Sequence, residues 1–425
     1  GYSVKWLQLG VIVMKSKTTA VRRYGPRSPH KFSSERIVFQ SRFKAQLSKR
    51  SRRSKRDDSF ATTSETAKSL SETEAKRWRD KNERFVEIRA ATIERKVTIS
   101  AERKKTAVQG WVRNTLQKGV DGIIAEYDKV DKLPNNASLY GDRDNVKNRY
   151  RDIGCIDKTR VRLKDVDASL DYIHANYIRS AKRKKRFICT QAPLDITVED
   201  FWHMVCQEHC EYIVMLCGLV EDNFSACAEY WPQKEGERLQ FQDFEIRNAG
   251  TSKIECTENN EKFIVTKSRL RVNSRMGTHT CSHLFWSQWA DRRPPPSSEI
   301  IQRIGREVRR TRESNKNVLE LRRPIIVHCS TGVGRAGTFV AIELLLETLM
   351  SGCQCDMPEF LRGLRQQRAM AVNSCMQYIG VYQQTMEYFK KRERIAASDR
   401  VKACSFITNC LNAFKSDLKD STPST

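Results

Sequence analysis

The amino-acid sequence predicts a mixed α/β domain in which a long twisted sheet is flanked by helices. Short apolar runs, such as residues 212–216 and 324–327, have the length and composition of buried strands. Polar and apolar side chains alternate over residues 171–178, as in a strand, whereas residues 106–132 have apolar side chains at helical spacing. Strands and helices that follow one another along a chain favour a layered α/β architecture.

The expected elements follow in order from residue 106. A helix or helix pair over 106–132 is closed by Pro134, because proline cannot continue a helix. The strands are expected near 159–163 and at 171–178, 186–193, 212–216, 239–247, 262–272 and 324–327. The later helices are expected at 197–208 and 298–313, and from 338 to 346.

The net charge of the chain is concentrated near its N-terminus. The chain has 77 Lys and Arg against 51 Asp and Glu, a net +26, and residues 1–105 hold 28 of the basic and 11 of the acidic residues. These residues show little apolar periodicity, a composition typical of disorder. We therefore predict a basic disordered extension over 1–105, a folded domain over 106–395 and a short tail without a readable role over 396–425.

The basic run 49–56 has two interpretations. Dense Lys and Arg can form a nuclear-import signal, or bind nucleic acid or an acidic surface weakly through the extension 15–105. Charge runs are more often solvated tails, and no interleaved aromatic residues support base stacking here. The 14 cysteines lack paired spacing, and no apolar run is long enough to span a membrane. A monomeric, cytoplasmic protein is expected.

The most informative stretch is the loop 327–337, VHCSTGVGRAG, between an expected strand and an expected helix. Backbone N–H groups in such a loop converge on one concavity, and the helix N-terminus adds partial positive charge. Arg335 can grip two oxygens of a tetrahedral anion, and the same field stabilises a thiolate. Cys329 is therefore predicted to attack phosphorus and form a phosphocysteine. The amides expected to bind the phosphate belong to Ser330, Thr331, Gly332, Val333 and Gly334.

The string HCSTGVGRAG resembles the signature loop of the cysteine-dependent protein phosphatases, and in particular of their tyrosine-specific branch. The resemblance covers residues 106–392 and implies the protein-tyrosine-phosphatase fold, as a single catalytic domain of the non-receptor kind. It implies hydrolysis of phosphotyrosine in proteins, without a metal or another cofactor.

Two further motifs carry the resemblance and imply substrate recognition and acid catalysis. KNRYRD at 147–152 is similar to the recognition loop, in which Tyr150 would stack on the substrate ring and Asp152 would hold the peptide backbone. QWADRR at 288–293 is similar to the mobile Trp-Pro-Asp loop. It places Trp289 before Asp291, which would protonate the leaving oxygen and later activate water.

The same resemblance implies a supporting set around the loop. Glu221 would hold Arg335, and His328 directly precedes the nucleophile. Gln377 would orient the attacking water, together with Asn373, which stands where a first glutamine is usual.

Several positions depart from the family pattern and support a rival hypothesis. A phosphatase-like domain that binds phosphotyrosine without turnover would tolerate such changes, whereas a dual-specificity enzyme is disfavoured by Tyr150. The departures that motivate the rival hypothesis are Ala290 for Pro, Arg293 for Gly, Ala336 for Ser or Thr, and Asn373 for Gln. His174, where Asn is expected, is a further departure.

A zinc site is the alternative interpretation of one cluster, His203, Cys206, His209 and Cys210. Ordinary core packing is favoured, because large apolar residues crowd the same segment and the helix is expected to end near Glu208.

Overall fold

The structure, a computed structural model, describes residues 72–135, 137–140, 145–181, 183–314 and 323–420. The chain divides into two compact units, residues 1–83 and 84–425. In the first unit only residues 72–83 are described, and they belong to helix α2 (Glu72–Tyr127). The basic run 49–56 lies outside the described residues.

The second unit is built on a nine-stranded sheet within its described part, in the order β1-β2-β3-β11-β4-β10-β9-β8-β7. The neighbours β3–β11, β11–β4 and β4–β10 are parallel, and the outer pairs are antiparallel. The strands of this sheet are β1 (Arg160–Arg162), β2 (Tyr172–Ile178), β3 (Phe187–Thr190), β4 (Tyr212–Met215), β7 (Arg238–Phe241), β8 (Phe244–Glu258), β9 (Glu261–Ser274), β10 (Gly277–Phe285) and β11 (Ile325–His328). A separate antiparallel pair joins β5 (Val220–Glu221) to β6 (Phe224–Ser225).

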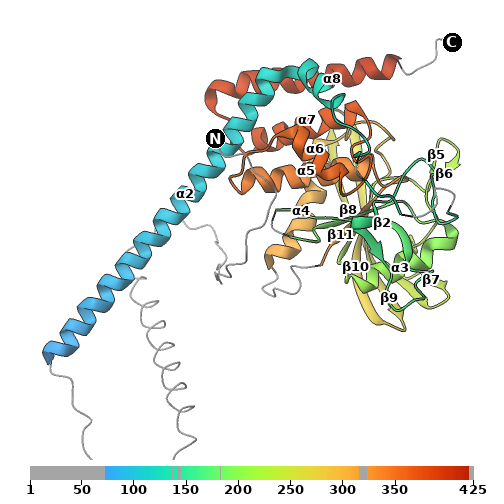
Figure 1. Cartoon of the computed structure of the whole chain (residues 1–425), viewed down its shortest axis with the longest axis horizontal. Helices are drawn as coiled ribbons and strands as arrows, with labels where there is room; N and C mark the ends of the chain where they lie inside the picture. The colour runs from blue at the N-terminus through green and yellow to red at the C-terminus, as the bar shows by residue number, and fades with distance from the viewer. Residues whose placement is uncertain (1–71, 136, 141–144, 182, 315–322, 421–425) are drawn as a thin grey trace, which may run out of the picture. The chain divides into compact units, whose positions relative to one another are not determined.

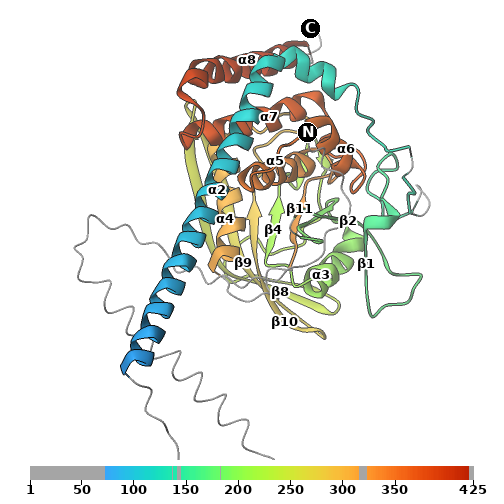
Figure 2. The ribbon, with the colours of Figure 1, turned by 60° about the vertical axis from the view of Figure 1, so that its left-hand side comes forward.

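Helices cover this sheet. Besides α2, the α-helices are α3 (Val198–Gln207), α4 (Ser298–Ser314), α5 (Arg335–Met350), α6 (Met357–Arg365), α7 (Cys375–Lys391) and α8 (Arg400–Asp420), and single 3-10 turns lie at η2 (Asp157–Thr159), η3 (Asp195–Thr197) and η5 (Ala397–Asp399). Figures 1 and 2 show α5, α6 and α7 grouped together over the sheet, α8 against α7, and α3 apart from this group. The arrangement is the predicted one, a large mixed sheet flanked by helices.

The central strands explain where the cysteine loop lies. The side chains of β3, β4 and β11 are all buried, as expected for parallel strands covered on both faces. Val327 of β11 pairs with Cys189 of β3 and with Val214 of β4. The loop that begins at Cys329 therefore leaves the carboxyl end of the middle strand and enters α5 directly, the place where open α/β sheets bind ligands.

Several predicted elements differ from those observed. Helix α2 begins at Glu72, inside the segment assigned to the extension, because residues 72–105 contain no Gly or Pro and many strong helix formers. Gly119 has non-helical backbone angles and divides α2 into two helices. The segment 239–247 is two strands joined by a tight turn, β10 was not predicted, and the segment 396–425 predicted as a tail contains α8.

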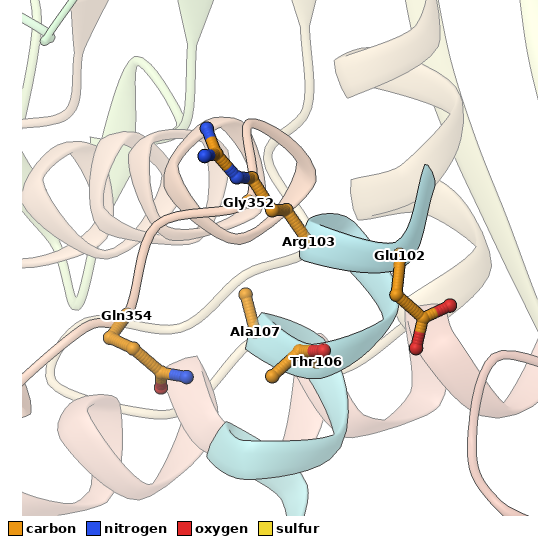
Figure 3. Close-up of a pocket in the computed structure, with 6 residues that line it drawn as sticks. All are labelled: Glu102, Arg103, Thr106, Ala107, Gly352 and Gln354. Carbon is orange, nitrogen blue, oxygen red and sulfur yellow. The ribbon is translucent and has the colours of Figure 1, made fainter. Parts of the chain in front are cut away.

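A pocket of about 290 Å³ lies between α2 and the residues that follow α5 (Figure 3). None of the residues that line it is a predicted site residue: Glu102, Arg103, Thr106, Ala107, Gly352 and Gln354. Gly352 has a φ of +81°, and a Cβ there would come within 2.9 Å of Arg103 Cβ, so this close approach requires glycine.

Candidate active site

The carbonyl groups of the cysteine loop accept hydrogen bonds from the surrounding scaffold. Ala192 N donates to Ser330 O at 3.0 Å, and Val372 N donates to Val333 O at 3.0 Å. Carbonyls that accept from the scaffold are directed away from the concavity of the loop. The amides of the loop can therefore line that concavity, as an anion-binding nest requires. Two of them bond within the loop, Gly332 N to Cys329 Sγ and Val333 N to Thr331 Oγ1.

A buried arginine that was not predicted completes this support. Arg368 donates from Nη2 to Thr331 O at 3.0 Å and from Nε to Gly332 O at 3.1 Å. Gly332 has a φ of +70°, and a Cβ there would lie 2.1 Å from Thr190 O, so only glycine fits. In this conformation Gly332 N donates to Cys329 Sγ at 3.2 Å, a contact that stabilises negative charge on the sulfur.

Arg335 is fully buried, and a carboxylate holds it in place. Its Nη1 and Nη2 donate to the two oxygens of Glu221 at 2.5 and 2.7 Å. Burial alone would lower the pKa of Arg335, but the Glu221 hydrogen bonds and the charge of Cys329 raise it above its usual value. Arg335 Nε is buried without a hydrogen-bond partner among the described residues, so one donor of the guanidinium remains available to an anion.

The acid loop 289–293 lies against this guanidinium. Arg335 Nη1 donates to Trp289 O at 2.9 Å, and Arg335 Nη2 lies 3.4 Å from Asp291 Oδ1. Trp289 is buried and donates from Nε1 to Arg293 O at 2.8 Å, which closes the loop into a turn. The Asp291 side chain remains 42% exposed, so solvent and substrate can reach the carboxyl.

Two polar side chains approach the cysteine loop from the start of α7. Gln377 Oε1 accepts from the backbone amides of Asn373 and Ser374 at 3.2 and 3.3 Å, which orients the Nε2 end toward the loop. A Cβ on Gly334 would come within 3.0 Å of this Nε2, so glycine admits the glutamine. Gln377 Nε2 and Asn373 Oδ1 are both buried without partners among the described residues. They form a donor and an acceptor for a small polar molecule.

The recognition loop is attached to the same place. Tyr150 is 37% exposed, and its hydroxyl lies 2.7 Å from Ser330 Oγ. Ser330 Oγ donates to Ala226 O, so the Tyr150 hydroxyl donates to Ser330. Arg149 and Gln191 hold the backbone here, because Gln191 Oε1 accepts from Arg149 N at 2.9 Å.

His328 is neutral and has a defined tautomer. Burial, together with Arg149 and Arg335, lowers its pKa to about 3. Its Nδ1 lies 3.3 Å from Cys329 O, which can only accept, so Nδ1 carries the proton. The Tyr230 hydroxyl, 2.7 Å from His328 Nε2, must then donate to it, and the same hydroxyl accepts from His283 Nε2 at 2.7 Å.

The structure thus brings together nearly all of the predicted site residues. Asp152 differs, because it is exposed on a turn, and its predicted role requires a bound peptide. The supporting residues that were not predicted are Arg149, Gln191, Tyr230 and Arg368. Arg149 stands inside the KNRY string and Tyr230 inside CAEYWP, so the motifs contained a signal for these two.

The possible metal cluster does not form a common site. Helix α3 ends at Gln207, and His209 follows it with a φ of 51°, so His209 leaves the helical face that carries His203 and Cys206. Across the described residues there is no group of three or more His, Cys, Asp and Glu side chains that could hold a metal ion.

A family model described as protein-tyrosine phosphatase matches residues 144–387, more than half of the chain. The chain belongs to the protein-tyrosine phosphatase family. The match confirms the resemblance drawn from the cysteine loop 327–337. It also contains the recognition loop, the acid loop and residues 373–377, the glutamine loop.

Relatives in this family include both receptor and non-receptor proteins. Tyrosine-protein phosphatase 69D of Drosophila melanogaster is 34% identical over 63% of this chain and 18% of its own length. Tyrosine-protein phosphatase non-receptor type 20 of Mus musculus is 30% identical over 64% of this chain and 62% of its own length. The chain therefore spans less than two thirds of these relatives.

The fold also has a solved counterpart. A structure of PTPN18 in complex with HER2-pY1248 phosphopeptides is 29% identical, covers 57% of this chain and 87% of that chain, and superposes with a TM-score of 0.50. The protein-tyrosine-phosphatase fold predicted from the sequence is thereby confirmed. In the part of the chain that the structure describes, no helix is long and apolar enough to cross a membrane.

Proposed function

We propose that this chain is an enzyme that hydrolyses phosphotyrosine in proteins through a phosphocysteine intermediate. The observation that carries the proposal is that a nucleophilic sulfur and an arginine able to bind an anion lie side by side in the cysteine loop. Cys329 Sγ accepts a backbone amide of an anion-binding loop, and a buried arginine beside it has an unpaired Nε. A nucleophilic sulfur and a phosphate-binding site are what phosphoryl transfer to cysteine needs.

The first chemical step transfers the phosphoryl group to sulfur. The Cys329 thiolate forms a bond to phosphorus while the bond from phosphorus to the tyrosine oxygen breaks. Asp291 gives its proton to that oxygen, so that tyrosine leaves as a neutral phenol. The loop amides and Arg335 stabilise the charge on the three equatorial oxygens.

The second step returns the enzyme to its starting state. The Asp291 carboxylate takes a proton from water, the water oxygen attacks phosphorus, and the phosphorus–sulfur bond breaks to release phosphate and the thiolate. The unpaired Gln377 Nε2 and Asn373 Oδ1 can orient this water. Gln377 therefore acts in the second step. Glu221 supports Arg335, and His328 supports the cysteine loop.

Phosphate release from matched phosphotyrosine and phosphoserine peptides tests this function. Tyr150 borders the loop through Ser330, so it deepens the approach to Cys329 and favours the longer phosphotyrosine. We expect release from phosphotyrosine to exceed release from phosphoserine by at least about 100-fold. Tyr150→Ala should lower kcat/KM for phosphotyrosine about three- to tenfold, because ring stacking is lost. Equal release from the two peptides would contradict the assignment.

A second candidate function is capture of phosphotyrosine without turnover. Ala290, Arg293, Ala336 and Asn373 replace residues usual in the family, and this motivates the alternative. The presence of Cys329, Arg335 and Asp291 in a connected geometry favours the enzyme instead. Tight binding of the phosphotyrosine peptide with no phosphate released would establish the binding module.

We also propose a division of labour along the chain. Catalysis is assigned to residues 106–395, since Ala107 and Val108 are the first buried side chains of α2 in the part from Ser100 onward whose side chains the structure describes. The basic extension 15–105 would contact nucleic acid or an acidic surface weakly and, through 49–56, direct nuclear import from a cytoplasmic pool. Retention on a nucleic-acid column should fall when residues 1–105 are removed, and unchanged retention would remove this role.

A further inference from the structure

Helix α8 lies beyond the segment that matches the family, which ends at residue 387. It contacts α7, and Figures 1 and 2 show the two helices packed together. The side chains that face the core recur at helical spacing: Ala403, Phe406, Ile407, Cys410 and Phe414. This apolar stripe fixes the position of the helix, and with it the position of the charged residues in its last turns.

One of these residues reaches the acid loop. Asp417 forms an ion pair with Arg293, and the two side chains are 38% and 25% exposed. The carboxylate also lies near the start of α7: burial raises the pKa of Cys375 to about 11, and the charge of Asp128 and then of Asp417 adds to the rise. Asp417 thus stands where the acid loop, the glutamine loop and α8 meet.

The contact falls on the part of the loop that holds the general acid. Arg292 O accepts from Ser374 Oγ at 2.6 Å, and Arg293 O accepts from Trp289 Nε1 at 2.8 Å. Asp291 therefore lies between two fixed points of the chain. Before it, Trp289 O accepts from Arg335, and after it, the carbonyls of residues 292 and 293 accept the two hydrogen bonds above. An interaction that restrains the Arg293 side chain therefore also restrains the position of the Asp291 carboxyl, two residues earlier in the same loop.

The pair depends on a departure from the family pattern. Glycine is usual at position 293 in the family that the sequence resembles, and glycine has no side chain that could meet a helix beyond the matched segment 144–387. Arg293 instead links the acid loop to α8 through its ion pair with Asp417. A surface ion pair changes a conformational equilibrium only by a factor of about two to five. Such a factor is small for the stability of a domain but measurable for a loop that must close in each turnover.

We propose that Asp417 is a positioning residue of this enzyme, which through Arg293 favours the arrangement of residues 289–293 that holds Asp291 beside Arg335. The proposal rests on the proposed function. It assigns to α8 a role in the delivery of the proton to the leaving tyrosine.

Kinetics of the full chain with two substrates test the proposal. Asp417→Asn and Arg293→Gln should each lower kcat/KM for a phosphotyrosine peptide about two- to fivefold. Neither should change kcat/KM for a dinitrophenyl phosphate, whose phenolate departs without a proton. The double variant should be no slower than the slower single variant, because both remove one interaction. Asp399→Asn makes the same charge change in the same C-terminal segment and should leave both substrates unaffected.

Hydrogen–deuterium exchange of the peptide 286–295 gives a readout that does not need turnover. Both single variants should speed exchange of its amides. Unchanged exchange, additive losses in the double variant, or equal losses on both substrates would overturn the positioning role. A wild-type chain that releases no phosphate would refute the proposed function, and the exchange experiment would still decide whether Asp417 holds the loop.

Discussion

Replacing Cys329 by serine is expected to lower phosphate release from a phosphotyrosine peptide by about 10⁴-fold or more. The sulfur lies on the floor of the loop, where it accepts the Gly332 amide, and it is the proposed attacking atom. A serine hydroxyl at this point holds its proton and is a far weaker nucleophile. The fold should remain intact, because oxygen occupies less space than sulfur and still accepts the amide.

Binding provides the control for this variant. Cys329→Ser should still bind the phosphotyrosine peptide, since Arg335 and the loop amides are unchanged, and isothermal titration would measure that affinity. Cys404→Ser, at an exposed position on α8, is the matched substitution and should keep full turnover. Turnover by Cys329→Ser at the wild-type rate would exclude the phosphocysteine route.

The sequence predicts the centre of the site well, and the reason is local. The strand, loop and helix around Cys329 are continuous in the chain, and they need only short-range rules: a buried apolar run, glycines at a tight turn and an apolar helix after it. The observed helix begins at Arg335, three residues before the expected apolar segment, so the arginine of the cysteine loop is also the first residue of the helix.

Short-range rules do not predict the side-chain contacts between motifs that lie far apart in the chain. Glu221 and Arg335 are separated by 114 residues. They meet because β4 and β11 are neighbours in the sheet, and Glu221 lies in β5 after β4 whereas Arg335 begins α5 after β11. Arg368 supports the loop from 36 residues away through two backbone carbonyls, and no sequence pattern marks it for that role. The resemblance to a family supplied Glu221, whereas the structure was needed for Arg368.

The expected elements also omit β5, β6, α6 and α7, and β10 and α8 show two different physical reasons for such omissions. Strand β10 has few apolar residues and is held by pairing with β9 on one side and β4 on the other, so tertiary contacts decide its conformation. Helix α8 did carry a signal, because Phe406, Cys410 and Phe414 recur at four-residue spacing. Its connection to the acid loop, between residues 124 apart, had none.

Replacing Asp291 by asparagine is expected to lower kcat/KM for the phosphotyrosine peptide about 10²- to 10⁴-fold. Asp291 Oδ1 lies 3.4 Å from Arg335 Nη2, on a loop fixed by Trp289, so the carboxyl is next to the group that binds the phosphate. Asparagine has nearly the same shape and cannot give a proton to the leaving oxygen.

The leaving group separates this loss of proton transfer from a general disturbance of the site. With a dinitrophenyl phosphate, whose phenolate needs no proton, Asp291→Asn should retain most of the wild-type kcat/KM. A plot of rate against the acidity of the leaving phenol should therefore be steeper for the variant than for the wild type. If the variant lost the same factor on every substrate, Asp291 would be a structural residue of the loop, and another group would have to supply the proton. The acid would then have to be sought among the side chains that border the loop, since Arg335 remains charged throughout the pH range of the assay.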